Sequence, residues 1–185
     1  YAVTRGATTS LGTFIPGRLL RTTDGGATWT SFNGPSGDAN FSATSVHAVS
    51  DTRAFVTSND TIYVFDTTTP GWTAIRSFGA SNTLRRIRFA TDNTTGWVVG
   101  NNSLFAVTTT GGTTANSWGP FLELFPSGGT FEDICFDVTG HAKTILNRSN
   151  STQVWQQGAT GNDVWTVDAF PYVVEATSPR ARAVD

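Results

Sequence analysis

The stretch RTTDGGATWT, residues 21–30, carries the densest local signal in the sequence. Its distinctive residues are Thr22, Asp24, Gly26, Thr28 and Trp29. A carboxylate at the start of a turn can accept backbone N–H groups across it, glycine allows a positive φ, and an indole ring can pack over the turn. The stretch therefore predicts a tight connection between two β-strands, with a structural role.

Trp29 is the first of four evenly spaced tryptophans. Trp29, Trp72, Trp118 and Trp165 lie 43, 46 and 47 residues apart. A repeat of this length accommodates four short strands and their turns. The spacing predicts units at residues 1–40, 41–83, 84–129 and 130–171.

Aligned on these tryptophans, the units share three strand-like segments. The first is SVHAV (45–49), LRRIRF (84–89) and FEDICF (131–136). The second is AFVT (54–57), GWVVG (96–100) and AKTIL (142–146). The third is RLLRTT (18–23), IYVFDTT (62–68), LFAVTTT (104–110) and TQVWQQ (152–157). Repeated four-stranded antiparallel sheets form the blades of a β-propeller, so we predict an all-β β-propeller of about four blades in one domain, 1–185.

Closure of this propeller has two possible forms. The first unit lacks an opening strand, and YVVEA (172–176) could supply it, leaving 172–185 as closing strand and tail. Alternatively, the four blades belong to a larger propeller of six to eight, as part of a longer chain or completed by a second copy. The sequence leaves both forms open.

The 21–30 stretch resembles the Asp-box, the S/T-x-D-x-G-x-x-W signature of BNR repeats. Such repeats occur in sialidases, sortilin-type receptors and photosystem II assembly factors. The resemblance is complete only in this unit, because the third unit has Thr110 in place of the Asp and the others keep little beyond the Trp. It implies a propeller in which the motif lies at the periphery, away from the ligand-binding face.

Composition excludes several classes of function. The net charge is −2 and 14% of residues are charged, which gives no electrostatic case for nucleic-acid binding. No apolar stretch reaches the about 18 residues of a membrane span.

The single cysteine, Cys135, allows no internal disulfide and is expected to be buried. His47 and His141 have no second ligand at a metal-binding spacing. We expect neither metal nor cofactor.

Charged residues on two first-segment strands form the candidate channel site. Strict alternation places Leu84, Arg86 and Arg88 on one face of their strand, and Arg85, Ile87 and Phe89 on the other. Asp133 of the next unit lies on the corresponding side. Either Arg86 or Arg88 pairs with Asp133 across the channel, or the arginines bind an anion or an acidic glycan.

A sialidase-like site would need an arginine cluster, a Tyr–Glu pair and an acid/base Asp. The candidates are Arg85, Arg86, Arg88, Tyr63, Glu132 and Asp133. However, TFIP (13–16) lacks the arginine of the Phe/Tyr-Arg-Ile-Pro motif of sialidases, and no carboxylate pair stands out. We therefore expect no catalysis.

Six N-x-S/T sequons suggest an extracellular glycoprotein. They begin at Asn40, Asn59, Asn93, Asn101, Asn147 and Asn150, all expected in turns or at blade edges. The favoured hypothesis is a non-catalytic, secreted or surface-exposed propeller that binds a protein partner or assembles with itself. The alternatives are a subunit of an extracellular filament or virion appendage, and a sialidase-like glycosidase or glycan-binding lectin.

Overall fold

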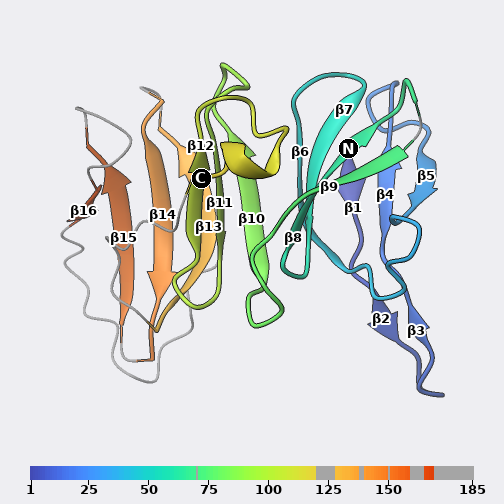
Figure 1. The fold of residues 1–185 in the computed structure, drawn as a ribbon, viewed down its shortest axis with the longest axis horizontal. Coiled ribbons are helices and arrows are strands. Elements are labelled where there is room, and N and C mark those ends of the chain that lie inside the picture. Colours follow the sequence, from blue (N-terminus) through green and yellow to red (C-terminus); the bar gives the residue numbers. More distant parts are fainter. Residues whose placement is uncertain (70, 120–127, 138–139, 150, 159–164, 169–185) are drawn as a thin grey trace.

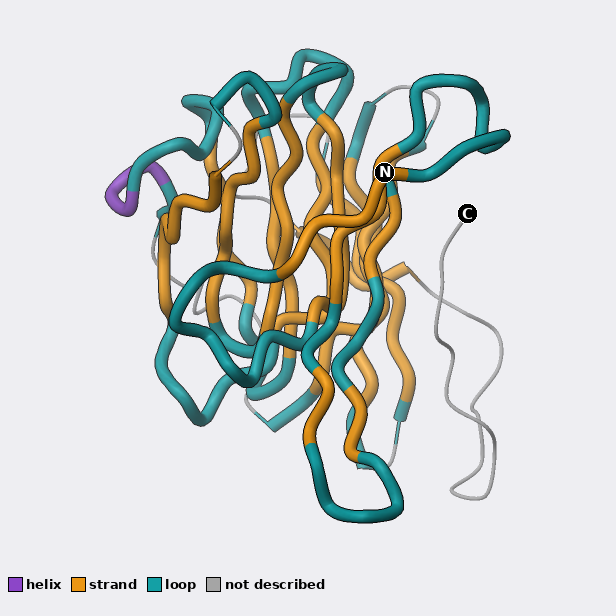
Figure 2. The backbone as a smooth tube through the Cα atoms, turned by 90° about the vertical axis from the view of Figure 1, so that its right-hand side faces the viewer, coloured by secondary structure: helices purple, strands orange, loops and turns teal. Residues whose placement is uncertain are grey.

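The computed structural model describes residues 1–69, 71–119, 128–137, 140–149, 151–158 and 165–168. Within them the chain is almost entirely strand and loop, with a single 3-10 turn, η1 (Ala115–Ser117) (Figure 2). Apart from the two-stranded hairpin β2–β3, the described strands form four antiparallel sheets in chain order, named blades 1 to 4 here (Figure 1).

Blade 1 contains β1 (Ala2–Val3), β4 (Arg18–Arg21) and β5 (Thr30–Asn33). Blade 2 contains β6 (Ala43–Ala48), β7 (Arg53–Ser58), β8 (Thr61–Asp66) and β9 (Gly71–Ser77). Blade 3 contains β10 (Leu84–Phe89), β11 (Gly96–Gly100) and β12 (Phe105–Thr108). Blade 4 contains β13 (Thr130–Phe136), β14 (Ala142–Asn147), β15 (Thr152–Gln157) and β16 (Trp165–Asp168).

The first strands of blades 2, 3 and 4 lie next to one another. β10 contacts β6 on one side and β13 on the other, and β1 of blade 1 contacts β6. Successive antiparallel blades that meet through their innermost strands are the arrangement of a β-propeller. The all-β propeller predicted from the repeats is thus the observed fold. The proposed closing strand at 172–176 lies outside the described residues.

Turn residues explain where the strands reverse. Asn59 (φ 50°) lies in the two-residue connection between β7 and β8, and Asn102 and Ser103 (φ 53° and 56°) lie between β11 and β12. Tight hairpins favour positive φ because it matches the twist of the flanking strands, and Asn tolerates it better than most residues. These polar turns fix the registers of the middle strands in blades 2 and 3.

A small hairpin interrupts blade 1 between β1 and β4. It consists of β2 (Ala7–Thr8) and β3 (Phe14–Ile15) and projects from the body (Figure 1). Leu11 at its tip is 91% exposed and Ile15 is 55% exposed. The repeat pattern did not predict this insertion, because its TFIP strand matches none of the shared segments.

Three hydrophobic clusters fill the spaces between successive blades. Leu19, Phe41 and Phe65 pack between blades 1 and 2. Phe55, Ile87 and Trp118 belong to the cluster between blades 2 and 3, and a third cluster joins blades 3 and 4. The core is therefore divided into layers, one for each pair of neighbouring blades.

Phe41→Ala tests the layer between blades 1 and 2. The side chain is fully buried, so we expect a loss of about 3–5 kcal/mol in the free energy of unfolding, measured by urea denaturation. Leu11→Ala is the control, since an exposed tip residue should change stability by less than about 0.5 kcal/mol. Equal effects of the two substitutions would contradict the layered core.

Candidate functional site

The turn between β4 and β5 is closed by its own side chains. The Thr22 hydroxyl donates to Asp24 Oδ1 (2.7 Å), and the Asp24 carboxylate accepts the amide (2.9 Å) and the hydroxyl (2.5 Å) of Thr28. The Gly26 amide donates to the Thr22 hydroxyl (2.9 Å), with Gly26 at φ 98°. These bonds, those from Thr28 first, hold the pKa of Asp24 well below its usual range. The motif side chains thus serve the turn itself.

The four repeat tryptophans have different surroundings. Trp29 is 48% exposed and donates its indole N–H to the carbonyl of Gly26 (3.0 Å), and the buried Trp118 makes the same bond to Gly112 (2.9 Å). The indole of Trp72 donates to Asn33 of blade 1 (2.9 Å). The fourth, Trp165, packs on Phe105, with ring centroids 4.9 Å apart. Trp29 and Trp118 thus each close the turn that precedes them.

A register shift near the start of the first strand in blades 2, 3 and 4 changes the predicted alternation. The shifts fall between Ala43 and Ser45, between Leu84 and Arg86, and between Phe131 and Asp133. Thr44, Arg85 and Glu132 are therefore bulge residues. Each is an extra residue in the first strand of its blade and has no paired residue on the second strand.

The bulge corrects one sequence prediction. Leu84 does not share a face with Arg86 and Arg88; it packs with Ile87 and Phe89 in the cluster between blades 2 and 3. The alternation rule failed because it assumes that every residue of one strand pairs with one residue of its neighbour. A bulge adds an unpaired residue, and the side chains before it then point to the opposite face. Arg86 and Arg88 remain on a common face.

Arg86 and Asp133 join the inner strands of blades 3 and 4. Arg86 Nε lies 2.5 Å from Asp133 Oδ1, and Arg86 Nη2 lies 2.6 Å from Oδ2, a bidentate pair. The Asp133 side chain is 6% exposed and that of Arg86 is 29% exposed. Asp133 also accepts the amide of Ile134 (2.8 Å). This guanidinium is therefore used in packing two blades together.

Arg88 has a different environment from Arg86. Its guanidinium donates to the carbonyls of Val46 (3.3 Å) and Ile87 (3.4 Å), and burial and then the charge of Arg86 lower its pKa. Nearby, burial and then the charge of Arg88 lower the pKa of His47 to about 4. Arg88 thus places a cation beside a neutral imidazole at His47.

Cys135 is partly exposed, so the expectation that it is buried was wrong.

The residues named for a sialidase-like site do not form one cluster. Arg85 approaches Glu132 (4.0 Å), beside the Arg86–Asp133 pair. Tyr63 instead lies on β8, where its hydroxyl donates to Asp38 (3.2 Å). Within the described residues, His, Cys, Asp and Glu side chains nowhere gather in a group of three that could hold a metal ion.

The sequons differ in accessibility. Asn40, Asn59 and Asn93 are exposed, and Asn101 is partly buried with its side chain bonded to Thr83 and Ser81. Asn147 contradicts the expectation of a turn or a blade edge, because it is the last residue of β14, a middle strand of blade 4, and is 4% exposed. Asn150 lies outside the described residues.

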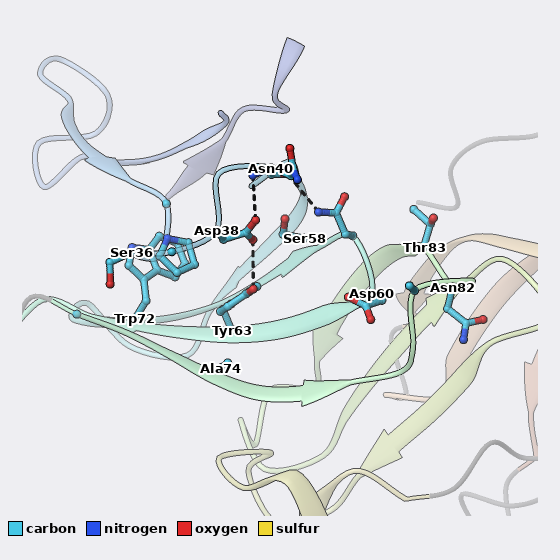
Figure 3. Close-up of a pocket in the computed structure, with 16 residues that line it drawn as sticks. Ser36, Asp38, Asn40, Ser58, Asp60, Tyr63, Trp72, Ala74, Asn82 and Thr83 are labelled. Atoms are coloured by element: carbon cyan, nitrogen blue, oxygen red, sulfur yellow. Dashed lines mark hydrogen bonds between the residues drawn. The ribbon is translucent and has the colours of Figure 1, made fainter. Parts of the chain in front are cut away.

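A groove that the sequence did not predict lies between blade 2 and loop 34–40, which connects blade 1 to blade 2 (Figure 3). It has a volume of about 1020 Å³. Its walls come from loop 34–40, the β7–β8 turn, strands β8 and β9, and residues 80–83. The only sequence signals were two aspartates in turns and the glycine-rich loop GPSGD (34–38), which ordinary turn composition also explains.

Tyr63 and Asp38 face each other in the middle of this groove (Figure 3). Besides the Tyr63 hydroxyl, the Asp38 carboxylate accepts the amide of Asn40 (3.1 Å). Burial, followed by the charge of Asp38, raises the pKa of Tyr63 to about 12. Tyr63 is therefore a neutral hydrogen-bonding group at physiological pH.

Comparison with known proteins identifies the fold. Neither a protein-family model nor a curated protein matches the sequence. Among solved structures, the chain is similar to YCF48 bound to a D1 peptide, with a TM-score of 0.57 and 16% identity. The match covers 81% of this chain and 48% of that chain, so this chain spans about half the length of YCF48. The likeness supports the β-propeller fold.

None of the helices in the described part of the chain has the length and apolar character needed to cross a membrane.

Asp133→Leu tests the pair between blades 3 and 4. We expect a loss of about 2–3 kcal/mol in the free energy of unfolding, less than the about 3–5 kcal/mol of a fully buried pair because Arg86 is partly exposed. The double variant Arg86→Met/Asp133→Leu should recover most of the loss, since it leaves no unpaired charge. The prediction is wrong if the double variant is less stable than Asp133→Leu.

The lowered pKa of His47 predicts a pH range in which the free energy of unfolding changes. Its pKa is about 4 in the folded chain against 6.5 ordinarily, so the unfolded chain binds more protons between these values. Stability should therefore decrease as the pH falls from 6.5 to 4. Urea midpoints measured across this range should depend less on pH in His47→Gln, and identical profiles for both proteins would count against the prediction.

Proposed function

We propose that this protein is a non-catalytic β-propeller that binds a segment of a partner protein in the groove between blade 2 and loop 34–40. The observation that carries the proposal is the groove itself, an open, elongated surface lined by backbone turns, two aromatic rings and hydrogen-bonding side chains. Ligand sites typically combine such concavity with a few polar groups that fix orientation.

Two further facts support a binding role. The Asp-box side chains and the Arg86–Asp133 pair serve a turn and a blade contact. The groove, in contrast, combines a concave surface with several polar side chains that line it. YCF48, whose fold this chain shares, is known bound to a D1 peptide. We infer from this likeness that the chain binds a peptide, but we do not infer that the peptide is D1.

The location and assembly of the protein also belong to the proposal. The exposed sequon at Asn93, which lies outside the groove, favours a secreted or surface-exposed glycoprotein. Asn40 and Asn59 line the groove, so the binding role requires these two sequons to carry no glycan. Self-assembly into a filament is the second candidate, favoured by the projecting β2–β3 hairpin with Leu11 and Ile15 exposed. No observation in the described part of the chain favours the glycosidase alternative.

Ala74→Trp tests the binding role by filling the groove. Ala74 is exposed on β9 and lines the groove, while its neighbour Thr73 is exposed but does not. Peptides selected from a random octapeptide display library against the wild-type protein should bind Ala74→Trp at least about tenfold more weakly, a loss of about 1.4 kcal/mol. Thr73→Trp, which adds the same ring to the adjacent position, should bind them normally.

Two results would overturn the proposed function. One is a selection that enriches no peptide above background. The other is a set of enriched peptides whose affinity, measured by fluorescence polarisation, is equal for Ala74→Trp and Thr73→Trp.

A further inference from the structure

We propose that the groove between blade 2 and loop 34–40 selects an extended peptide that carries Arg or Lys, with Asp38 and Asp60 as its recognition residues. This inference rests on the proposed function and names the chemistry of the partner. It comes from the charges and hydrogen bonds of the groove.

The groove carries negative charge without compensation. Its lining contains Asp38 and Asp60 and includes no Lys, Arg or His. Within the described residues, neither carboxylate forms a salt bridge, whereas Asp66 and Asp133 do. Two carboxylates in a concave surface attract cations more strongly than they would on a flat surface, because the protein walls focus their field.

Neutral donors hold both carboxylates in place. Asp38 accepts from the Asn40 amide and the Tyr63 hydroxyl, while Asp60 accepts from the hydroxyls of Thr61 (2.9 Å) and Ser77 (2.6 Å). A carboxylate has about four acceptor positions, so each retains capacity for a charged donor. The donors orient the two groups without cancelling their charge.

The floor of the groove suits the stem of a basic side chain. Tyr63 and Trp72 provide aromatic surface, and aromatic faces attract guanidinium and ammonium groups. Gly71, Ala74 and Ala80 leave room for a peptide backbone to approach.

The dimensions favour a peptide over a small cation. A volume of about 1020 Å³ lies just above the range of about 300–1,000 Å³ typical of ligand pockets, which is enough for several residues. The labelled residues extend from Ser36 and Trp72 past Asp38 to Asp60, Asn82 and Thr83 (Figure 3). An elongated site with acidic groups at its middle and towards one end fits an extended chain.

The test compares three fluorescein-labelled peptide pools. All three pools are built on the octapeptides selected against the wild-type protein and differ at one fixed position. That position is Arg in the first pool, citrulline, the neutral isostere of Arg, in the second, and Glu in the third. At low salt the Arg pool should bind at least about tenfold more tightly than the citrulline pool, with Glu weakest, and added salt should narrow the gap.

Two variants connect the preference to the groove. Asp38→Asn and Asp60→Asn should each reduce the Arg-over-citrulline preference severalfold while preserving binding of the citrulline pool. The matched control is Asp51→Asn, an exposed carboxylate outside the groove, which should leave the preference unchanged. Urea denaturation of each variant establishes that it is folded, and either groove variant alone suffices for the test.

The outcomes separate the two proposals. Equal binding of the Arg and citrulline pools, or a preference for Glu, would overturn this inference and leave the proposed peptide binding intact. A selection that enriches no octapeptide above background would overturn both. Binding of a neutral oligosaccharide such as maltohexaose, abolished by Ala74→Trp while peptides bind unaffected, would assign the groove to glycans instead.

Discussion

Burial of both faces of each β-sheet is the constraint on which this structure depends. A middle sheet has two apolar faces, and neighbouring sheets are the surfaces available to cover them. β8 illustrates the division, because Ile62 and Val64 belong to the cluster with blade 3 whereas Phe65 packs towards blade 1. Blades 2 and 3 can therefore fold stably only as parts of a series, as repeat architectures require.

The same constraint explains the polar pair between blades 3 and 4. The inner strands approach closely, so a charged residue there loses much of its hydration and needs a partner. Asp133 meets this need with two bonds from Arg86 and one from the amide of Ile134. The bulge at each inner strand leaves the apolar residues on one face and this pair on the other.

Periodic features of the sequence predicted the blades well because each blade repeats the same packing problem. The spacing of Trp72 and Trp118 and the shared strand segments reflect that repetition. By contrast, the bulge at Arg85 and the burial of Asn147 depend on register, which a single strand does not encode. The groove was beyond prediction because Asp38, Asp60 and Tyr63 come from separate segments that only the folded chain brings together.

Unequal strand lengths account for the position of the groove. β4 and β5 have 4 residues each, whereas β8 has 6 and β9 has 7. Phe32 of β5 covers Phe65 on β8, with ring centroids 4.7 Å apart, but Tyr63, two residues earlier on the same face, lines the groove. Blade 1 is too short to cover that end of blade 2, and loop 34–40 crosses the gap with small and polar residues. This incompletely covered end of blade 2 is thus also the surface where Asp38 and Asp60 remain available to a partner.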